Sequence, residues 1–394
     1  MRNHYFLRTA AQALLLLTLF SCEKFPAVDV TDDPLPVSLE ELARMFSQLP
    51  LEQEHLDEVH TAVSSSLEYG YDEEYMMADL FASPGSGVGS RKAGTKASDT
   101  QWKKPLRSLI EDYLASSYAT KGEDAPSSAE EFISVLTSSD AQIYWPYSED
   151  WDGSSLPVIT FDPGDGMTAN IGYEMRADGS VKEVVVTEQT AREKPVWVMN
   201  RNDDSAFQTI EMLRREDPAW GTGGSIIVHR DTKAESEGTK TLILRDFETS
   251  RNYDTWFAGG SEFFVKAGSV EDFYASTEAE MRLYSPSITD FLVVVKRSQV
   301  GRKIPFNAIL VSEWTEQLQS LAFMITEDDG GTQTSWKCNA KVMIKSKSYG
   351  FEIEIPFNSR DDIVWRGQLS RSYFEKNNEV EGHFGDVYLT FAFI

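Results

Sequence analysis

Cysteine and positive charge are both scarce in this chain of 394 residues. The 2 cysteines cannot build a disulfide framework or a cysteine-rich zinc site. Lys and Arg together number 37 against 63 Asp and Glu, which gives a formal net charge of -26. Because a phosphate backbone is held by a positive field, this charge excludes nucleic acid as the main ligand. With 41% hydrophobic residues, the composition is that of a globular protein.

Familiar catalytic motifs are missing as well. No H-E-x-x-H pair occurs, and His55 and His60 are five residues apart, so they do not share a helix face. No G-x-S-x-G nucleophile elbow lies between a strand and a helix. Residues 221–225 lack the lysine of a phosphate-binding loop and predict a turn. The sequence therefore predicts no catalytic residue, and a non-enzymatic role is expected.

The first 22 residues have the organisation of a secretion signal. Arg2 and Arg8 precede an apolar run over residues 10–20, which is too short to span a bilayer as a stable helix. The run leads into Leu19-Phe20-Ser21-Cys22. This tetrapeptide resembles a bacterial lipobox, in which signal peptidase II cleaves before the cysteine. The resemblance implies a signal peptide over residues 1–21 and a lipid on Cys22 that anchors the protein to a membrane.

Residues 22–37 form an acidic, proline-rich stretch that predicts an extended tether. The layout of lipobox, tether, helical start and β-rich end is similar to that of uncharacterised envelope lipoproteins of the Bacteroidota. The resemblance implies a location in the cell envelope, at the outer membrane. The membrane face, periplasmic or surface-exposed, stays open at this point.

The remaining chain predicts an α+β fold of several domains. Residues 38–125 are expected to be helical, with a Gly/Ser-rich loop over residues 83–100. Residues 126–270 mix helical and strand patterns. Residues 271–394 predict an antiparallel β-sandwich, because short alternating segments follow one another between turn signals.

Several individual elements can also be predicted. Ser38 and Glu41 match a capping box at the start of a helix, and residues 73–81 predict a short helix. Residues 225–229 and 241–245 flank a polar turn and predict a hairpin. Eight strands are expected in the C-terminal part, over residues 279–284, 291–296, 306–312, 319–326, 335–345, 349–356, 362–369 and 386–393.

Aromatic and acidic side chains gather in the middle of the chain. The candidate ligand-binding residues are Tyr144, Trp145, Tyr147, Asp150, Trp151 and Asp152. Aromatic rings beside carboxylates can bind a sugar by stacking and hydrogen bonding. The same composition is typical of a tightly packed loop, and the sequence leaves both interpretations open.

Paired carboxylates would also suit glycoside hydrolysis, which needs two acids at a set separation. The acids available in this part are Glu149, Asp150, Asp152, Asp162 and Asp165. A lipid-anchored hydrolase acting on glycans is therefore the alternative to a binding protein. Sequence cannot show the separation of the carboxylates.

A second acidic group is expected at one end of the C-terminal strands. If successive strands reverse direction, the run ending in Asp328 and Asp329 lies at the same end as Asp361 and Asp362. Carboxylate oxygens at one end suit calcium. The basic pairs 296–297 and 302–303 bound a loop at that end and would compete by pairing with the acids. A calcium site and an ordinary charged rim are both left open, and no other cofactor is expected.

Cys338 shares an alternating face with Trp336 and Ala340, which predicts a buried hydrophobic side chain and not a nucleophile. Together with the resemblance, these patterns predict a membrane-anchored envelope lipoprotein that binds a protein or glycan partner through its β-rich parts. A structural role in an outer-membrane assembly is a further alternative.

Overall fold

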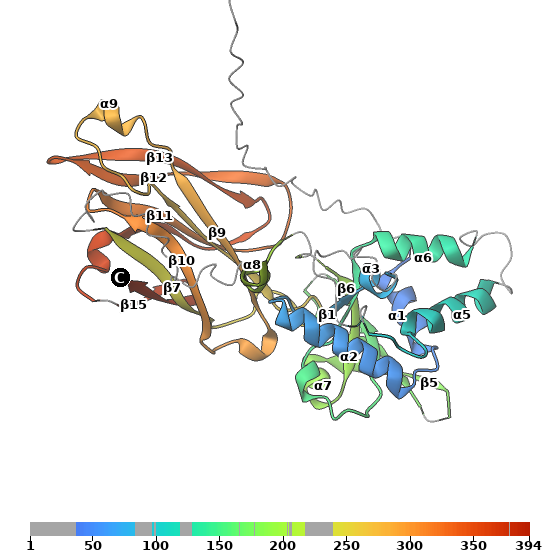
Figure 1. Ribbon diagram of the computed structural model, residues 1–394. Coiled ribbons are helices and arrows are strands. Elements are labelled where there is room, and N and C mark those ends of the chain that lie inside the picture. The colour runs from blue at the N-terminus through green and yellow to red at the C-terminus, as the bar shows by residue number, and fades with distance from the viewer. Residues whose placement is uncertain are drawn as a thin grey trace, which may run out of the picture.

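The computed structural model describes residues 37–82, 97, 100–118, 128–164, 166–176, 178–202, 204, 207–216, 239–377 and 379–394 (Figure 1). The fold is α+β, as predicted. Helices gather in the first half around one sheet, and two further antiparallel sheets occupy the second half (Figure 1). The predicted signal peptide, Cys22 and nearly all of the predicted tether lie outside the described residues. Within the described ranges, no helix is long and apolar enough to cross a membrane.

Among the described residues, the first half carries several helices, of which α7 was not predicted. They are α1 (Leu39–Ser47), α2 (Gln53–Glu68), α3 (Met77–Leu80), α5 (Leu106–Tyr118), α6 (Ala129–Ser138), α7 (Glu188–Glu193) and α8 (Ile210–Glu216). The capping box at the start of α1 is confirmed, because Ser38 Oγ accepts from Glu41 N and the Glu41 carboxylate accepts from Ser38 N. The predicted helix over residues 73–81 is wrong in its first turn, which is a strand held by a neighbouring strand.

A mixed sheet lies among these helices. Its strands, in spatial order, are β1 (Glu74–Met76), β2 (Ala141–Tyr144), β6 (Val196–Arg201), β3 (Val158–Phe161), β4 (Ala169–Met175) and β5 (Val181–Thr187). Only β3 and β6 run parallel among the described pairs. Helix α1 packs across β3, β4 and β6, where Leu42, Ala43 and Phe46 are fully buried. Burying this apolar stripe is the main source of stability for so short a helix.

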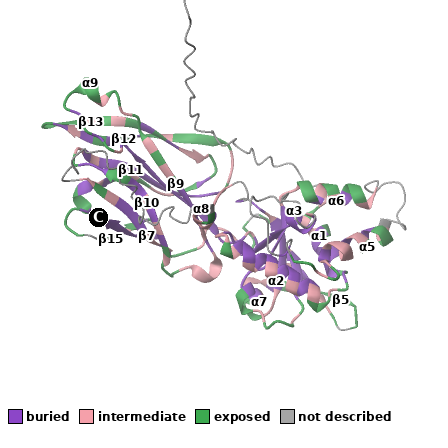
Figure 2. Ribbon diagram, viewed as in Figure 1, coloured by how far each residue is buried: buried purple, intermediate pink, exposed green. Residues whose placement is uncertain are grey.

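Two antiparallel sheets make up the second half. One has the order β10 (Ile304–Trp314), β7 (Lys240–Thr249), β16 (Val387–Phe393) and β15 (Glu379–Phe384). The other has the order β13 (Lys347–Asn358), β12 (Gln333–Ile344), β11 (Leu318–Glu327), β8 (Ser261–Ser269) and β9 (Ser287–Val295), and β14 (Asp362–Ser370) also pairs with β11. One apolar cluster draws on both sheets. Buried residues, purple in Figure 2, follow the strands of both halves.

The structure corrects one of the predicted C-terminal strands and adds another. Residues 279–284 are not a strand, because α9 (Glu278–Met281) begins there, with Thr277 Oγ1 accepting from Glu280 N. A threonine N-cap and acids in the first turn favour the helix over the apolar alternation. Seven of the eight predicted ranges do contain strands, and β15 was not predicted.

The predicted hairpin before β7 is also wrong. Strand β7 pairs with β10 along one edge and with β16 along the other, through Leu242, Ile243 and Leu244 in both cases. Both edges are therefore occupied over the range expected to pair with residues 225–229, which themselves lie outside the described residues. Cys338 is buried as predicted, and burial raises the pKa of its thiol to about 11.

Sheets and cores cross the predicted domain limits. Strand β1, from the part expected to be helical, pairs with β2. Strands β7 and β8, which precede residue 271, pair only with strands beyond it among the described residues. The division of the chain into domains stays a prediction.

The loop between β7 and β8 joins the two halves. Trp256 Nε1 donates to the Thr168 carbonyl at 3.0 Å, and Asn200 Nδ2 donates to the Ala258 carbonyl at 2.6 Å. Trp256 and Phe257 are buried against apolar residues of the first sheet. The two halves are thus held together by a continuous apolar contact as well as by hydrogen bonds.

A buried acid, Glu58 on α2, makes the stability of the first half depend on pH. Its carboxyl accepts from Leu106 N at 2.6 Å at the start of α5, and burial raises its pKa to about 7 from 4.5. Between these values the folded protein keeps a proton that the unfolded chain releases. The contribution of Glu58 to the free energy of unfolding therefore falls as pH rises from about 4.5 to about 7, by on the order of 3 kcal/mol.

We expect Glu58→Gln to flatten this part of the pH profile, because an amide does not titrate. Urea denaturation at pH 4, 6 and 8 measures the effect, with Glu130→Gln, an exposed acid of α6, as the control. Equal slopes for Glu58→Gln and wild type would contradict the assignment.

Candidate functional site

A small hollow lies at the turn that follows β2. Its volume is about 100 Å³, and it is lined by Trp145, Tyr147, Asp150, Trp151, Asp152, Ser155, Ala191, Arg192, Glu193, Lys194 and Pro195. Five of the six predicted ligand-binding residues belong to this lining. The sixth, Tyr144, is buried in the apolar cluster around Trp256 and Phe257. The second wall comes from α7 and the residues after it, which the sequence did not point to.

The turn carrying the hollow depends on Glu73, a residue far away in the sequence. Its carboxyl accepts from Tyr147 N at 3.1 Å, Ser148 N at 2.8 Å and Ser148 Oγ at 2.9 Å. Tyr147 adopts a left-handed backbone with φ 60°, which a non-glycine residue keeps only when its surroundings hold it. The buried carboxyl supplies that hold, and burial raises the pKa of Glu73 well above its usual value.

The aromatic rings pack mainly against one another. The Trp145 ring is 1% exposed and lies 5.6 Å from His60, 5.2 Å from Trp151 and 5.7 Å from Trp197, measured between ring centroids. Trp151 is only partly buried, and its Nε1 donates to the Ser155 carbonyl at 3.0 Å. Trp151 therefore presents a fixed, half-exposed ring at the hollow.

Tyr147 closes the other side of the hollow. Its hydroxyl donates to Glu188 Oε1 at 2.7 Å, and the Arg192 guanidinium lies 4.6 Å from the centre of its ring. Arg192 also pairs with Glu188 at 3.0 Å. The hollow thus combines a fixed aromatic ring with charges of both signs.

The predicted acids of this region do not act as one group. Asp152 accepts from Ser154 N, Ser155 N and Ser155 Oγ, and the bonds from Ser155 lower its pKa to about 2. Asp162 accepts from Gly164 N at 2.9 Å in a different turn. Asp150 is exposed, and Asp165 lies outside the described residues.

Glu149 has partners in the C-terminal half instead. Its carboxylate accepts from Lys296 Nζ at 3.3 Å and Ser298 Oγ at 3.0 Å. A hydrogen bond with Glu73 lowers its pKa to about 2. Glu149 and Asp152 are therefore engaged with different partners, and the hydrolase alternative stays a prediction.

The second predicted group of acids lies at the end of β11. Asn358 donates from its backbone N to Asp361 Oδ2 at 2.8 Å and from Nδ2 to Asp328 Oδ1 at 2.9 Å. Burial raises the pKa of Asp361 to about 7, and its hydrogen bond with Asp328 adds to this. Burial also raises the pKa of Asp329 to about 6, with the charges of Asp254 and Asp362 contributing. The turn after β11 and the start of β14 thus bring the four predicted acids close together.

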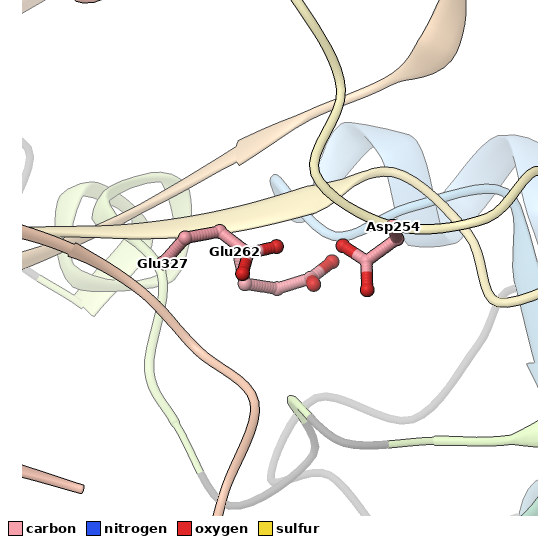
Figure 3. Close-up of side chains that lie close together, drawn as sticks. All are labelled: Asp254, Glu262 and Glu327. Atoms are coloured by element: carbon pink, nitrogen blue, oxygen red, sulfur yellow. The ribbon is translucent and has the colours of Figure 1, made fainter. Parts of the chain in front are cut away.

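Three further acids lie close together, namely Asp254, Glu262 and Glu327 (Figure 3). One carboxylate oxygen from each of Asp254, Glu262 and Glu327 lies within 4.8 Å of the others. Glu262 and Glu327 are buried, Asp254 is hydrogen-bonded to Glu327, and burial raises the pKa of Asp254. Three carboxylate oxygens at this spacing are a donor set that suits calcium, which takes further oxygens from backbone or water. The sequence run containing Glu327 pointed to this end, whereas the other two acids come from a loop and a strand start.

The predicted competing cations are directed elsewhere. Lys296 pairs with Glu149, and Arg297 Nε pairs with Glu188 Oε1 at 3.1 Å. Arg297 Nη1 also donates to the Asp254 carbonyl at 3.2 Å, and its charge opposes the rise that burial causes in the pKa of Asp254.

The calcium prediction has a direct test in the full chain at pH 8. A ligand that binds the folded state and not the unfolded chain raises the melting temperature. We expect millimolar calcium to raise it, and Glu262→Gln to reduce the rise, with Glu352→Gln on the exposed face of β13 as the control. An unchanged melting temperature in millimolar calcium contradicts a calcium site.

No protein-family model and no curated protein matches the sequence. Among solved structures, the chain is similar to a structure of Drosophila C2-DSL-EGF1, with 10% sequence identity and a TM-score of 0.17. The similarity covers 40% of this chain and 66% of that chain. A TM-score of this size supports no argument about fold or function, so function is argued from the site itself.

Proposed function

We propose that this protein is a lipid-anchored protein of the cell envelope that binds a glycan at the hollow beside Trp151. The anchor rests on the lipobox resemblance around Cys22 and on the apolar run before it. The resemblance to Bacteroidota lipoproteins favours the outer membrane. A glycan is the ligand that best fits an aromatic ring set beside carboxylates.

The observation that carries the binding proposal is the fixed Trp151 ring. A hydrogen bond to Ser155 and contacts with His60 and Trp145 hold the ring, so little side-chain entropy is lost when a ligand stacks on it. Arg192, Asp150 and Asp152 offer donors and acceptors around it. A hollow of about 100 Å³ encloses at most one sugar ring, so a longer glycan would extend over the surface.

We further infer that the two C-terminal sheets form the predicted β-sandwich. Phe323 of β11 and Phe391 of β16 belong to different sheets, and their ring centroids are 6.0 Å apart. Residues of both sheets share the larger apolar cluster. In this arrangement the sandwich carries the loop of Trp256 and Phe257, which supports the sheet behind the hollow.

Trp151→Ala tests the binding site. We expect it to weaken glycan binding about three- to tenfold, since an aromatic contact contributes about 0.5–1.5 kcal/mol. A glycan array finds the ligand, and calorimetry compares the variants. Asp150→Asn should weaken binding of the same ligand. Tyr373→Ala, at an exposed aromatic residue of the other half, should leave binding unchanged. If Trp151→Ala binds every array ligand as wild type does, the hollow is not the site, and a protein partner takes its place as the alternative.

Cys22→Ala tests the anchor. We expect the wild type to carry a lipid mass increment and to partition with membranes, and the variant to lose both. Intact mass and membrane fractionation measure this, and protease treatment of whole cells assigns the membrane face. A wild type without a lipid mass increment contradicts the lipid anchor but does not bear on glycan binding at the hollow.

A further inference from the structure

Strand β5 forms one edge of the first sheet. It pairs antiparallel with β4 through seven residue pairs, from Ala169 opposite Thr187 to Met175 opposite Val181. Among the described residues, no strand pairs with its other edge. Half of the backbone N–H and C=O groups of β5 therefore point outward, where another strand can bind them.

The two faces of β5 differ sharply. Val186 is fully buried, and with Val184 it packs against the cluster that holds Trp256 and Phe257. The opposite face carries Val185, which is 71% exposed, and Val181, which is 39% exposed. Among the described residues, helix α1 packs mainly on β3, β4 and β6, and Val185 stays exposed on this side.

Among the described edge strands, β9 and β14 also carry an exposed aliphatic residue, Ile288 at 41% and Ile363 at 40%, but neither approaches the 71% exposure of Val185. Strand β15, an edge of the second half, alternates exposed acids Glu379 and Glu381 with its partly buried positions. Such charges prevent pairing with a further strand. The β4–β5 hairpin lies on the side of the molecule away from the C-terminal strands, where a second molecule can reach it (Figure 1).

We propose that β5 pairs antiparallel with β5 of a second copy of this chain, about a twofold axis at Val185. Twofold symmetry places the residue at the axis opposite its own copy and pairs its neighbours reciprocally. With Val185 at the axis, Val184 faces Val186 of the copy and Glu183 faces Thr187. Val185 of each copy then covers Val185 of the other, and the two six-stranded sheets become continuous.

Neighbouring registers are excluded by their charges. An axis at Lys182 or Glu183 sets like charges directly opposite each other, which is destabilising. An axis at Val184 sets Glu183 against Val185 of the copy, which covers a carboxylate with an aliphatic side chain. An axis at Val186 likewise sets Val184 against Glu188 of the copy, so among these registers the one at Val185 joins the apolar part of the strand to itself without a charge conflict.

The net charge of -26 does not prevent this contact. Charges further apart than about 8 Å are screened at physiological ionic strength. The charges of the β4–β5 hairpin nearly balance, since Arg176 and Lys182 oppose the three acids Glu174, Asp178 and Glu183. A contact made by one strand and a few valines is small, which places the dimer among weak, reversible associations.

Sedimentation of the full chain carrying Cys22→Ala, from about 1 to 200 µM, tests the proposal in the weak-association range. We expect a monomer–dimer equilibrium that Val185→Lys weakens at least about tenfold, because the two lysines meet at the axis. Leu283→Lys, at a residue 82% exposed near α9, should dimerise as the unsubstituted chain does. A monomer over the whole range, or unchanged dimerisation of Val185→Lys, overturns the proposal.

Cysteine crosslinking tests the register in the same background. Val185→Cys places two thiols opposite each other, with Cβ atoms about 4.5–5.5 Å apart, so oxidation should give a disulfide dimer. Lys182→Cys places the two thiols about 20 Å apart along the strands and should not crosslink. Cys338 is buried and does not compete. Equal crosslinking of both variants overturns the register, and this result is independent of glycan binding at the hollow.

Discussion

Burying carboxylates without enough cations is the constraint on which the centre of this protein depends. Asp72 and Glu73 lie where the two halves meet, and both are almost fully buried. Asp72 accepts from Gly260 N at 2.6 Å, and Glu73 accepts from the backbone of the Tyr147 turn. Burial raises the pKa of both carboxyls, since desolvation disfavours the charged form.

The protein meets this cost in two ways. Backbone N–H groups stabilise buried acids such as Glu73 and Asp361, whose pKa values burial raises. Lys296 and Arg297 neutralise those nearer the surface, where they pair with Glu149 and Glu188. A Cβ at Gly260 would lie 2.6 Å from the Val295 carbonyl oxygen and 3.1 Å from Asp72 Oδ2, so only glycine allows the close approach of Asp72 to this backbone.

The two proposed surfaces follow from the same arrangement. The loop that brings Trp256 and Phe257 to the first sheet buries one face of β5 and supports Tyr144 and Tyr147 behind the hollow. The other face of β5 has no such cover, which leaves Val185 exposed. The hollow and the β5 edge therefore lie on one sheet but depend on different side chains, and ligand binding and self-association can be separated by mutation.

Local patterns in the sequence determined the α+β class, the capped start of α1 and seven of the eight predicted C-terminal strands, because caps and alternation act over a few residues. They also placed Trp145, Tyr147, Asp150, Trp151 and Asp152 near one another, since these are close in the chain. Only the tertiary structure decided that α7 completes the hollow and that Glu73 holds its turn. Likewise it decided that Asp254 and Glu262 join Glu327, and that β7 is enclosed by β10 and β16. These contacts join residues distant in sequence, and no local propensity encodes which distant strand or carboxylate will meet another.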